Sequence, residues 1–409
     1  MAPPATERRT WARTLRLLGP AFVASIAYVD PGNVAVNISA GSRHGFLLLW
    51  VLVLANAIAM LVQYLSAKLG IATGRSLPEL LGDRLPRLWR LLFWVQAEAV
   101  GAATDLAEVL GGAIALNLLF GLPLLPGGII VAAASIALLL LQSRSQQRFE
   151  YAVMVLLAVI AIGFVAGGLA RPVPWADAAT GLVPRFTNPD SVLLAASMLG
   201  ATVMPHAIYL HSALARDRHG IVAPSERRPI IIATRVDVLI ALIIAGLVNI
   251  AMLVLAATSL AGVPGTDTIA GAQAAIVTHL GPAIGILFGI GLLASGLASS
   301  SVGSYAGAVV MAGLLKVKVP LIVRRIVTLI PALIVLAIGV DPTEALVISQ
   351  VVLSIGIPFA LVPLVLLTGS RRVMGDQVDA WWTRAGARIA TVLVVALNVL
   401  LVALAVGAY

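Results

Sequence analysis

The sequence contains no cysteine, which excludes disulfide bonds, thiolate metal sites and cysteine redox motifs. Charged side chains are also scarce, because they make up 11% of the chain where a soluble domain carries about 25%. Hydrophobic residues account for 60%, and the mean hydropathy is +1.03. These values exclude an ordinary soluble protein and predict a membrane protein.

Apolar runs of about 20 residues, long enough to cross a bilayer, recur along the 409 residues. The alternating pattern of a membrane β-barrel is absent from the sequence. We therefore expect an all-α polytopic membrane protein with a single transport domain, 1–409, and eleven transmembrane helices. The expected helices lie near 17–41, 45–67, 91–118, 122–142, 150–170, 189–214, 231–258, 281–313, 319–339, 342–367 and 387–408.

The formal net charge of +9 would suggest nucleic-acid binding in a soluble protein. If the N-terminus is cytoplasmic, however, 24 of the 27 Lys and Arg residues fall in cytoplasmic segments or the adjoining helix ends. This asymmetry follows the positive-inside rule and reflects topology, not a nucleic-acid partner. We expect a multi-pass protein of the cell (inner or plasma) membrane, surrounded by lipid, with the C-terminus outside. The sequence indicates no obligate protein partner.

Two of the expected helices contain a break. The first helix carries YVDPGNVAVN at 28–37, and the sixth carries GATVMPHAIYLHS at 200–212. Five helices separate the two positions, so the two halves of the chain enter the membrane from opposite sides. This pattern predicts two inverted five-helix repeats, 17–170 and 189–367, followed by one extra helix, 387–408.

Each break offers backbone oxygen to a ligand. A proline has no N–H and clashes with the carbonyl four residues earlier, so Pro31 frees the carbonyl of Ala27, and Pro205 frees that of Ala201. Gly32 adds backbone freedom beside the first break. Freed carbonyls inside a membrane are costly unless they line a cavity or meet a ligand. The negative end of a half-helix stands behind each one, which suits a cation.

The side chains at the breaks suit a divalent metal. Asp30 supplies a carboxylate, Asn33 an amide oxygen and Met204 a thioether. A thioether favours softer transition metals over Mg²⁺ and Ca²⁺, so Mn²⁺ and Fe²⁺ fit the set, as does Cd²⁺. Each feature alone has an ordinary explanation: a structural kink, a packed methionine, or a pore-facing or salt-bridged aspartate. Their coincidence at matching places in the two halves favours a cation site.

Acidic residues inside the expected helices indicate a route for protons. Besides Asp30, the residues Glu98, Asp105 and Glu108 all lie in the helix 91–118. At 100° per residue, Asp105 lies about 20° and Glu108 about 80° from Glu98, so one face can hold all three. Carboxylates in file within a bundle are typical of a proton relay.

Basic and amide residues could support this route. Arg324 and Arg325 are candidate partners for the carboxylates, although they could equally serve as topology signals near a helix end. A histidine titrates near physiological pH, and His206 adjoins Met204 while His211 follows five residues later; a histidine at a helix break can also be a purely structural residue. The remaining amides, Asn56 and Asn249, are expected to form hydrogen bonds between helices.

The motifs DPGN and MPH resemble those of the Nramp family of proton-coupled divalent metal transporters. The wider stretches ATDLAEVLG at 103–111 and GATVMPHAIYLHSAL at 200–214 are also similar to that family, particularly to its bacterial members. The resemblance extends from the first expected helix through the eleventh. It implies a leucine-transporter-type fold, with the two breaks as the centre of transport.

The resemblance also implies roles for individual residues. A related branch that carries Mg²⁺ lacks the methionine, so Met204 argues for Mn²⁺ or Fe²⁺. Asp105, Glu108 and Arg325 would form a polar network toward the cytoplasm, with Glu98 an outlying member. The implied metal-site residues are Asp30, Asn33, Met204, Gln350 and the carbonyls of Ala27 and Ala201; His206 is implied in proton transfer or gating, and Asn56 and Asn249 in support of the broken helices.

Other functions fit the sequence less well. A sodium-coupled amino-acid transporter of the same fold would hold a substrate carboxylate, which Asp30 would repel. A membrane metalloenzyme would need a motif such as H-E-x-x-H, which the sequence lacks. A channel would not need two broken helices around one site, because that arrangement favours alternating access. We therefore expect a transporter that is not an enzyme and has no cofactor, with the metal as its transported substrate.

Overall fold

The computed structural model describes residues 19–169, 171–266, 268–317 and 319–407, and every regular element in those ranges is helical. Residues 1–18, 170 and 408–409 lie outside the described residues, and with them the ends of the expected ranges 17–41, 17–170 and 387–408. The first half contains α2 (Pro20–Ser25), η1 (Ile26–Val29), α3 (Pro31–His44), α4 (Leu49–Thr73), α5 (Leu77–Arg84), α6 (Arg87–Phe120), α7 (Leu124–Arg144) and α8 (Gln146–Gly168). The remainder contains α9 (Trp175–Thr180), α10 (Pro189–Thr202), α11 (Pro205–His219), α12 (Pro224–Ser259), α13 (Ile269–Leu280), α14 (Pro282–Leu315), α15 (Leu321–Ile338), α16 (Pro342–Thr368), α17 (Arg371–Met374), η2 (Gly375–Gln377) and α18 (Trp381–Gly407).

Ten helical segments in the described part of the chain are long and apolar enough to cross a membrane. The expected sixth helix is one of them, formed by α10 and α11 together. The expected first helix is present as shorter pieces, namely α2, η1 and α3. The polytopic helical architecture is therefore confirmed, while the count of eleven crossings remains a prediction.

Several segments expected to be loops contain short helices: α5, α9, α13 and α17. They are too short or too polar to give a membrane-spanning signal; α5, for example, rests on a capping box between Ser76 and Glu79. Two long helices also begin earlier than expected, α12 at Pro224 and α18 at Trp381. Both extend beyond their apolar run into charged sequence, where hydropathy no longer marks the helix.

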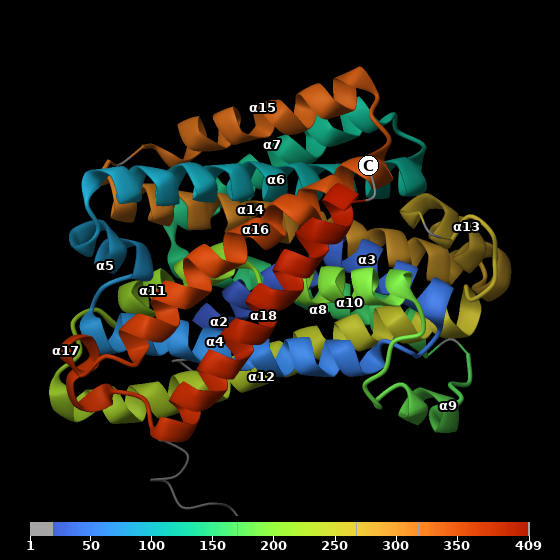
Figure 1. Ribbon diagram of the computed structural model, residues 1–409. Helices are drawn as coiled ribbons and strands as arrows, with labels where there is room; N and C mark the ends of the chain where they lie inside the picture. The colour runs from blue at the N-terminus through green and yellow to red at the C-terminus, as the bar shows by residue number, and fades with distance from the viewer. Residues whose placement is uncertain (1–18, 170, 267, 318, 408–409) are drawn as a thin grey trace, which may run out of the picture.

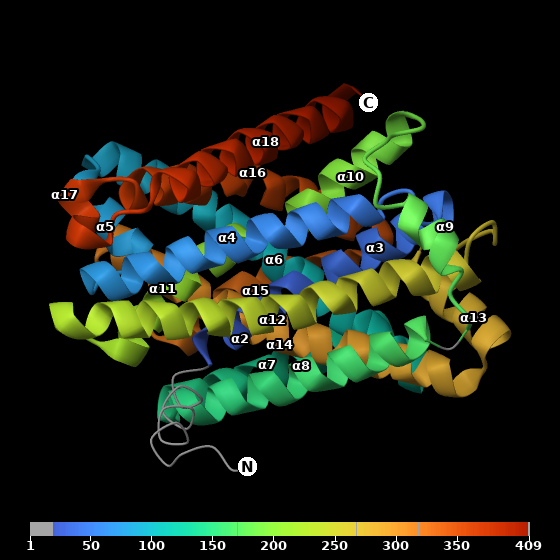
Figure 2. The ribbon, with the colours of Figure 1, turned by 90° about the horizontal axis from the view of Figure 1, so that it is seen from below.

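The long helices run side by side, with α7, α15 and α18 on the outside of the bundle (Figures 1 and 2). The two broken helices occupy the interior instead, since residues 23–34 and 198–215 are all buried. Small residues allow this close packing. In α14, a Cβ on Gly296 would lie 2.8 Å from the carbonyl oxygen of Glu108 in α6, so only glycine permits that approach.

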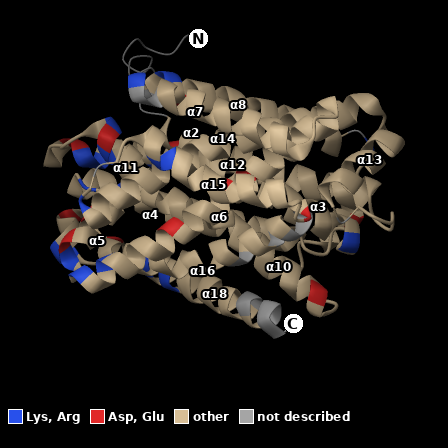
Figure 3. Cartoon of the chain, turned by 90° about the horizontal axis from the view of Figure 1, so that it is seen from above, with Lys and Arg blue, Asp and Glu red and all other residues tan. Residues whose placement is uncertain are grey.

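Figure 3 shows Lys and Arg gathered at one end of the bundle, around α5, α17 and the end of α11. We call this the basic end. At the opposite end, α3 and α10 are joined by Asp190, which pairs with Arg43 at 3.4 Å and His44 at 2.9 Å. This separation of charge agrees with the topology expected from the sequence. The orientation of the chain in a membrane remains a prediction.

The first half-helix is held by a buried aspartate of α12. The backbone N–H groups of Gly19 and Ala21 donate to the carboxylate of Asp237 at 3.1–3.3 Å. These are N–H groups at the start of α2, which have no partner within their own helix. Beside them Glu150 pairs with Arg218 of α11 at 3.0 Å. Asp237 therefore fixes the position of α2 and so of the break that follows it.

This contact generates a prediction that uses the absence of cysteine. Ala24 in α2 is buried, and a single Ala24→Cys substitution would provide the only thiol in the chain. In an Asp237→Ala background, maleimide labelling of that cysteine should become about tenfold faster or more, because α2 would no longer be held by its hydrogen bonds to Asp237. As a control, Ala195→Cys in α10 should label equally in both backgrounds. Unchanged labelling of the Ala24→Cys variant in the Asp237→Ala background would show that Asp237 does not anchor α2.

Candidate metal centre between two broken helices

The first break is a single extended residue between two helices. Asp30 has φ −71° and ψ 168°, the extended conformation favoured before a proline. Pro31 then begins α3 at a position where its missing N–H costs nothing. The Asp30 carboxylate caps α3 by accepting a hydrogen bond from the backbone N–H of Asn33 at 2.7 Å. Local sequence thus directs a carboxylate to the start of the second half-helix.

The second break repeats this arrangement with a different side chain. Met204 has φ −83° and ψ 127°, and Pro205 begins α11 after it. The Met204 side chain is fully buried. A methionine cannot cap a helix as an aspartate does, so its thioether is free of that task. Both breaks therefore place a potential ligand directly before a proline, as expected from the sequence.

One side chain joins the two breaks. The Asn33 amide nitrogen donates to the Asp30 carboxylate at 2.7 Å and to the carbonyl oxygen of Ala201 at 3.2 Å. All three were predicted as ligands, and two of them are separated by 168 positions in the chain. The Ala201 carbonyl accepts this bond with one of two lone pairs, so it can still face a cation.

The Asp30 carboxylate is only half satisfied. Its Oδ1 accepts two hydrogen bonds from Asn33, whereas its Oδ2 is buried and has no hydrogen-bond partner among the described residues. A buried carboxylate oxygen without a partner is costly. A bound cation would remove that cost, which makes Oδ2 the strongest single indication of a metal site.

Neighbouring carbonyls of the first break are held by side chains from the surrounding helices. Ser295 donates to the carbonyl of Val29 at 2.6 Å, and Asn249 donates to that of Tyr28 at 2.7 Å. In the described part of the chain, no side chain donates to the carbonyl of Ala27, the one predicted as a ligand. Asn249 also accepts a hydrogen bond from Asn37, so it links α12 to both η1 and α3.

Two further amides lie where glycine leaves room for them. A Cβ on Gly32 would overlap the amide nitrogen of Gln350, so this α16 side chain lies directly against the first break. Both Gln350 amide atoms are buried and lack a partner within the described ranges. Asn56 packs in the same way against Gly246 of α12, away from the break itself. Gln350 therefore lies against the first break, whereas Asn56 contacts α12.

The three carboxylates of α6 have three different environments. Arg325 is fully buried and pairs with Asp105 at 2.5 Å, with Ser135 and Ser300 as further partners. Arg324 pairs with Glu98 at 2.8 Å. Both arginines are thus partners of carboxylates as well as contributors to the charge asymmetry.

Glu108 stands apart from these pairs. Both of its carboxylate oxygens are buried, and neither has a hydrogen-bond partner in the portion of the chain described. The resemblance to the Nramp family implies a polar network of Asp105, Glu108 and Arg325. In the structure Asp105 pairs with Arg325, and Glu108 forms no hydrogen bond with either of them.

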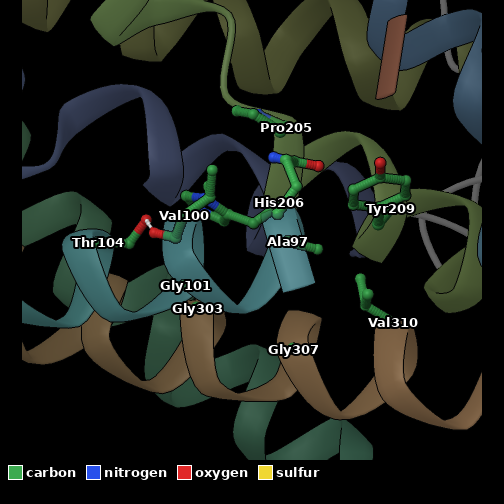
Figure 4. Close-up of a pocket in the computed structure, with 11 residues that line it drawn as sticks. Ala97, Val100, Gly101, Thr104, Pro205, His206, Tyr209, Gly303, Gly307 and Val310 are labelled. Carbon is green, nitrogen blue, oxygen red and sulfur yellow. Dashed lines mark hydrogen bonds between the residues drawn. The ribbon is translucent and has the colours of Figure 1, made fainter. Parts of the chain in front are cut away.

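The two histidines of α11 also differ. Both ring nitrogens of His206 are buried and lack partners among the residues described, and the ring lines a small cavity (Figure 4). His211 lies 2.8 Å from the Gln63 side-chain oxygen, and Gln63 donates to the hydroxyl of Tyr28 at 2.6 Å. His211 therefore links α11, α4 and η1, where the sequence suggested a place in the proton route.

Four of the buried polar residues that the sequence did not single out are Gln63, Tyr28, Glu150 and Asp237. The two acidic residues among them lie near the start of an expected apolar helix, at 150–170 and 231–258. Their burial results from the packing of α2 and α11, for which the local sequence carries no signal. For Gln63, the only available signal was a lone amide in an apolar run.

Comparison with known proteins places these features in a family. A family model described as natural resistance-associated macrophage protein-like (Nramp) matches residues 21–404. The divalent metal cation transporter MntH of Mycobacterium tuberculosis is 56% identical over 405 residues, which cover 98% of this chain and 95% of that protein. The divalent metal cation transporter MntH of Bacillus subtilis is 48% identical over 392 residues, covering 95% and 92%.

Solved structures of membrane transporters also match this chain. The manganese transporter of Eremococcus coleocola, in complex with an aromatic bis-isothiourea substituted compound, matches with a TM-score of 0.85 and 29% identity, over 98% of this chain and 88% of that one. MhsT in complex with L-phenylalanine matches with a TM-score of 0.56 and 14% identity, which shows a shared fold alone. The leucine-transporter-type fold is thereby confirmed. By the family match and the identity to its members, this chain belongs to the Nramp family.

Proposed function

We propose that the chain imports divalent transition metals, Mn²⁺, Fe²⁺ and also Cd²⁺, together with protons, by alternating access. Nramp proteins are membrane transporters and not enzymes, and several relatives are named divalent metal cation transporters. The observation that carries the proposal is the unpartnered Oδ2 of Asp30. It lies at the point where the Asn33 amide joins the two broken helices. The metal is the transported substrate, and transport requires no resident cofactor and no protein partner.

The donor set favours transition metals. Asp30 supplies the charge, the carbonyls of Ala27 and Ala201 supply neutral oxygen, and Met204 supplies the sulfur. Asn33 presents its nitrogen to Asp30, so its amide must turn before its oxygen can bind a metal. Gln350 lies nearby and could complete the shell as the helices move. Hydrogen bonds within the site would then be exchanged for bonds to the metal.

Proton movement is proposed to use the carboxylates of α6. A divalent cation bound beside Asp30 would favour the ionised carboxylate, so Asp30 would release its proton when the metal binds. His206 follows Pro205 at the second break, and both residues line the small cavity. Glu108 has no competing partner among the described residues, which suits it to accept and release a proton. The ion pairs of Asp105 with Arg325 and of Glu98 with Arg324 extend the route toward the basic end.

Two alternatives are less well supported. A Mg²⁺ transporter of the related branch would lack the methionine, whereas Met204 is buried directly at the second break. A sodium-coupled amino-acid transporter is suggested only by the fold shared with MhsT. In that case the substrate carboxylate would have to lie close to Asp30, and like charges repel strongly inside a protein.

The basic end is proposed to face the cytoplasm, with the N-terminus on that side and the C-terminus outside, in the cell (inner or plasma) membrane. The clustering of Lys and Arg at one end supports this orientation. The two breaks would then divide α2 and α11 toward the cytoplasm from α3 and α10 toward the outside. We retain the division into inverted repeats, 17–170 and 189–367, as part of this proposal.

Substitution of Asp30 tests the site and the coupling together. In proteoliposomes carrying a metal dye and a pH dye, the unmodified protein should take up Mn²⁺ and acidify the interior. Asp30→Ala should reduce both signals to the level of empty liposomes, because the site loses its only carboxylate. Asp177→Ala, at an exposed acidic residue of α9, is the control and should transport normally. Near-normal Mn²⁺ uptake by Asp30→Ala would contradict the site, and uptake without acidification would contradict symport.

Substitution of Met204 tests the choice of metal. Met204→Ala should weaken competition by Cd²⁺ for Mn²⁺ uptake and increase that by Ca²⁺ and Mg²⁺, since the soft ligand is lost. Met198→Ala in α10 is a matched control, because Met198 is also a buried methionine but does not lie at the break. The measurement is a competition panel in proteoliposomes. If Met204→Ala keeps the selectivity of the unmodified protein, the thioether does not select the metal.

A further inference from the structure

The segment that joins α16 to α18 lies at the basic end and contains α17 and η2 (Figure 3). Its inward-facing side chains fix it to the bundle. Asp379 is buried and accepts a hydrogen bond from Lys68 of α4 at 2.6 Å. Lys68 also lies over the ring of Tyr64, 5.8 Å from its centroid. Met374 of α17 is buried in the hydrophobic core. The inner side of the segment is therefore fully engaged with the protein.

Four arginines in this segment and the start of α18 have no acidic partner. Arg371 and Arg372 in α17 and Arg388 in α18 are exposed, and Arg384 in α18 is half-buried. Among the residues that the structure describes, no carboxylate forms an ion pair with any of the four. The exposed Asp376 in η2 offsets only part of their charge. The outer side of the segment is therefore positive.

Other cations at the basic end are neutralised by the protein itself. Arg75 and Lys316 both pair with Asp83. Arg216 pairs with Glu79 and with Asp217. The arginines around α17 instead leave their charge available to an anion outside the protein.

Packing brings Arg384 of α18 toward the arginines of α17. A Cβ on Gly369 would lie 3.6 Å from Cδ of Arg384, so the arginine stem lies against the chain two positions before Arg371. Its Nε is buried and has no hydrogen-bond partner in the described part of the chain. We call Arg371, Arg372 and Arg384 the arginine cluster. A guanidinium presents a planar fork of N–H donors that matches the oxygens of a phosphate group.

The start of α18 has the composition of a helix that enters a bilayer. Trp381 and Trp382 are 70% and 64% exposed, and their ring centroids are 5.9 Å apart. At 100° per residue, these two, Arg388, Ile389 and Val392 fall within about 120° of the helix surface. All five are exposed. Tryptophan is typical of the head-group level of a membrane, and apolar side chains of its hydrocarbon. The arginine cluster therefore lies at the level of lipid head groups.

We propose that the arginine cluster binds the head group of an anionic phospholipid, with the acyl chains along the exposed face of α18 beside Trp381 and Trp382. The charge of the cluster favours an anionic head group over phosphatidylcholine, whose phosphate is balanced by its own choline. The exposed aromatic and apolar face favours a lipid over a soluble phosphate, which would use the arginines alone. The bound lipid would hold α18 against the end of α16. This inference does not depend on the metal or proton chemistry proposed above.

Fluorescence quenching by brominated lipid tests this contact, because bromine quenches tryptophan that lies against it. The full-length protein in phosphatidylcholine vesicles would receive a small fraction of brominated phosphatidylglycerol or of brominated phosphatidylcholine. The phosphatidylglycerol should quench more strongly, and Trp381→Phe/Trp382→Phe should remove the excess. In Arg371→Gln/Arg372→Gln, the preference for phosphatidylglycerol should fall by about fivefold or more, since an arginine near an anionic surface typically contributes about that factor.

A second pair of arginines supplies a matched control. Arg144 and Arg148 are exposed and lie where α7 meets α8, on the opposite side of the bundle from α18 (Figure 2). The variant Arg144→Gln/Arg148→Gln loses the same charge and should keep the full preference for phosphatidylglycerol. Elution of each variant at the volume of the unmodified protein in size-exclusion chromatography shows that it is folded.

The outcomes distinguish a lipid site from general attraction between charges. Equal quenching of the unmodified protein by the two lipids, or excess quenching that persists without Trp381 and Trp382, would overturn the proposal. An equal loss of preference in the control pair would overturn it too, because the effect would then be one of total charge. Inorganic phosphate in place of chloride, at equal ionic strength, should leave the preference unchanged. If inorganic phosphate removes it, the cluster binds a soluble anion and the lipid assignment is wrong.

Discussion

The hydrogen bonds of the Asn33 amide hold the centre of this structure together. The amide contacts Asp30 in the first broken helix and the Ala201 carbonyl in the second. Neighbouring helices hold the first break in place. Side chains of α14 and α12 donate hydrogen bonds to its carbonyls, and Asp237 fixes the start of α2. Because unpaired backbone groups are costly in a membrane, two breaks in the interior are stable only with such partners. The contact also brings the Asp30 carboxylate and the Ala201 carbonyl close together, where a cation could bind.

The metal site and the small cavity differ in how their polar groups are satisfied. At the first break, Oδ1 of Asp30 has partners in Asn33, whereas Oδ2 of Asp30 and the amide of Gln350 have none among the described residues. Around the cavity, groups without a partner in the described part of the chain dominate, as with Gln96, His206 and Tyr209. A single unpaired carboxylate oxygen suits a cation of defined geometry.

The sequence predicted features that arise from local chemistry. Long apolar runs predicted the helices, and Pro31 and Pro205 predicted the breaks, because a proline acts on its own turn of helix. The sequence could not predict which buried groups would pair. Glu108 and Asp105 lie three positions apart on one helix, yet only Asp105 meets an arginine. The burial of Asp237 and the link from His211 through Gln63 to Tyr28 depend on helices that are distant in sequence. Short helices such as α5 and α13 carry no hydropathy signal long enough to reveal them.

The most direct test of the central claim is X-ray absorption spectroscopy of the protein loaded with Cd²⁺. With no cysteine in the chain, any sulfur bound to the metal must come from methionine. We expect a coordination shell of oxygen with one sulfur, and we expect the sulfur to be absent from Met204→Ala. An all-oxygen shell in the unmodified protein, or a sulfur that persists in Met204→Ala, would contradict a metal site between the two breaks.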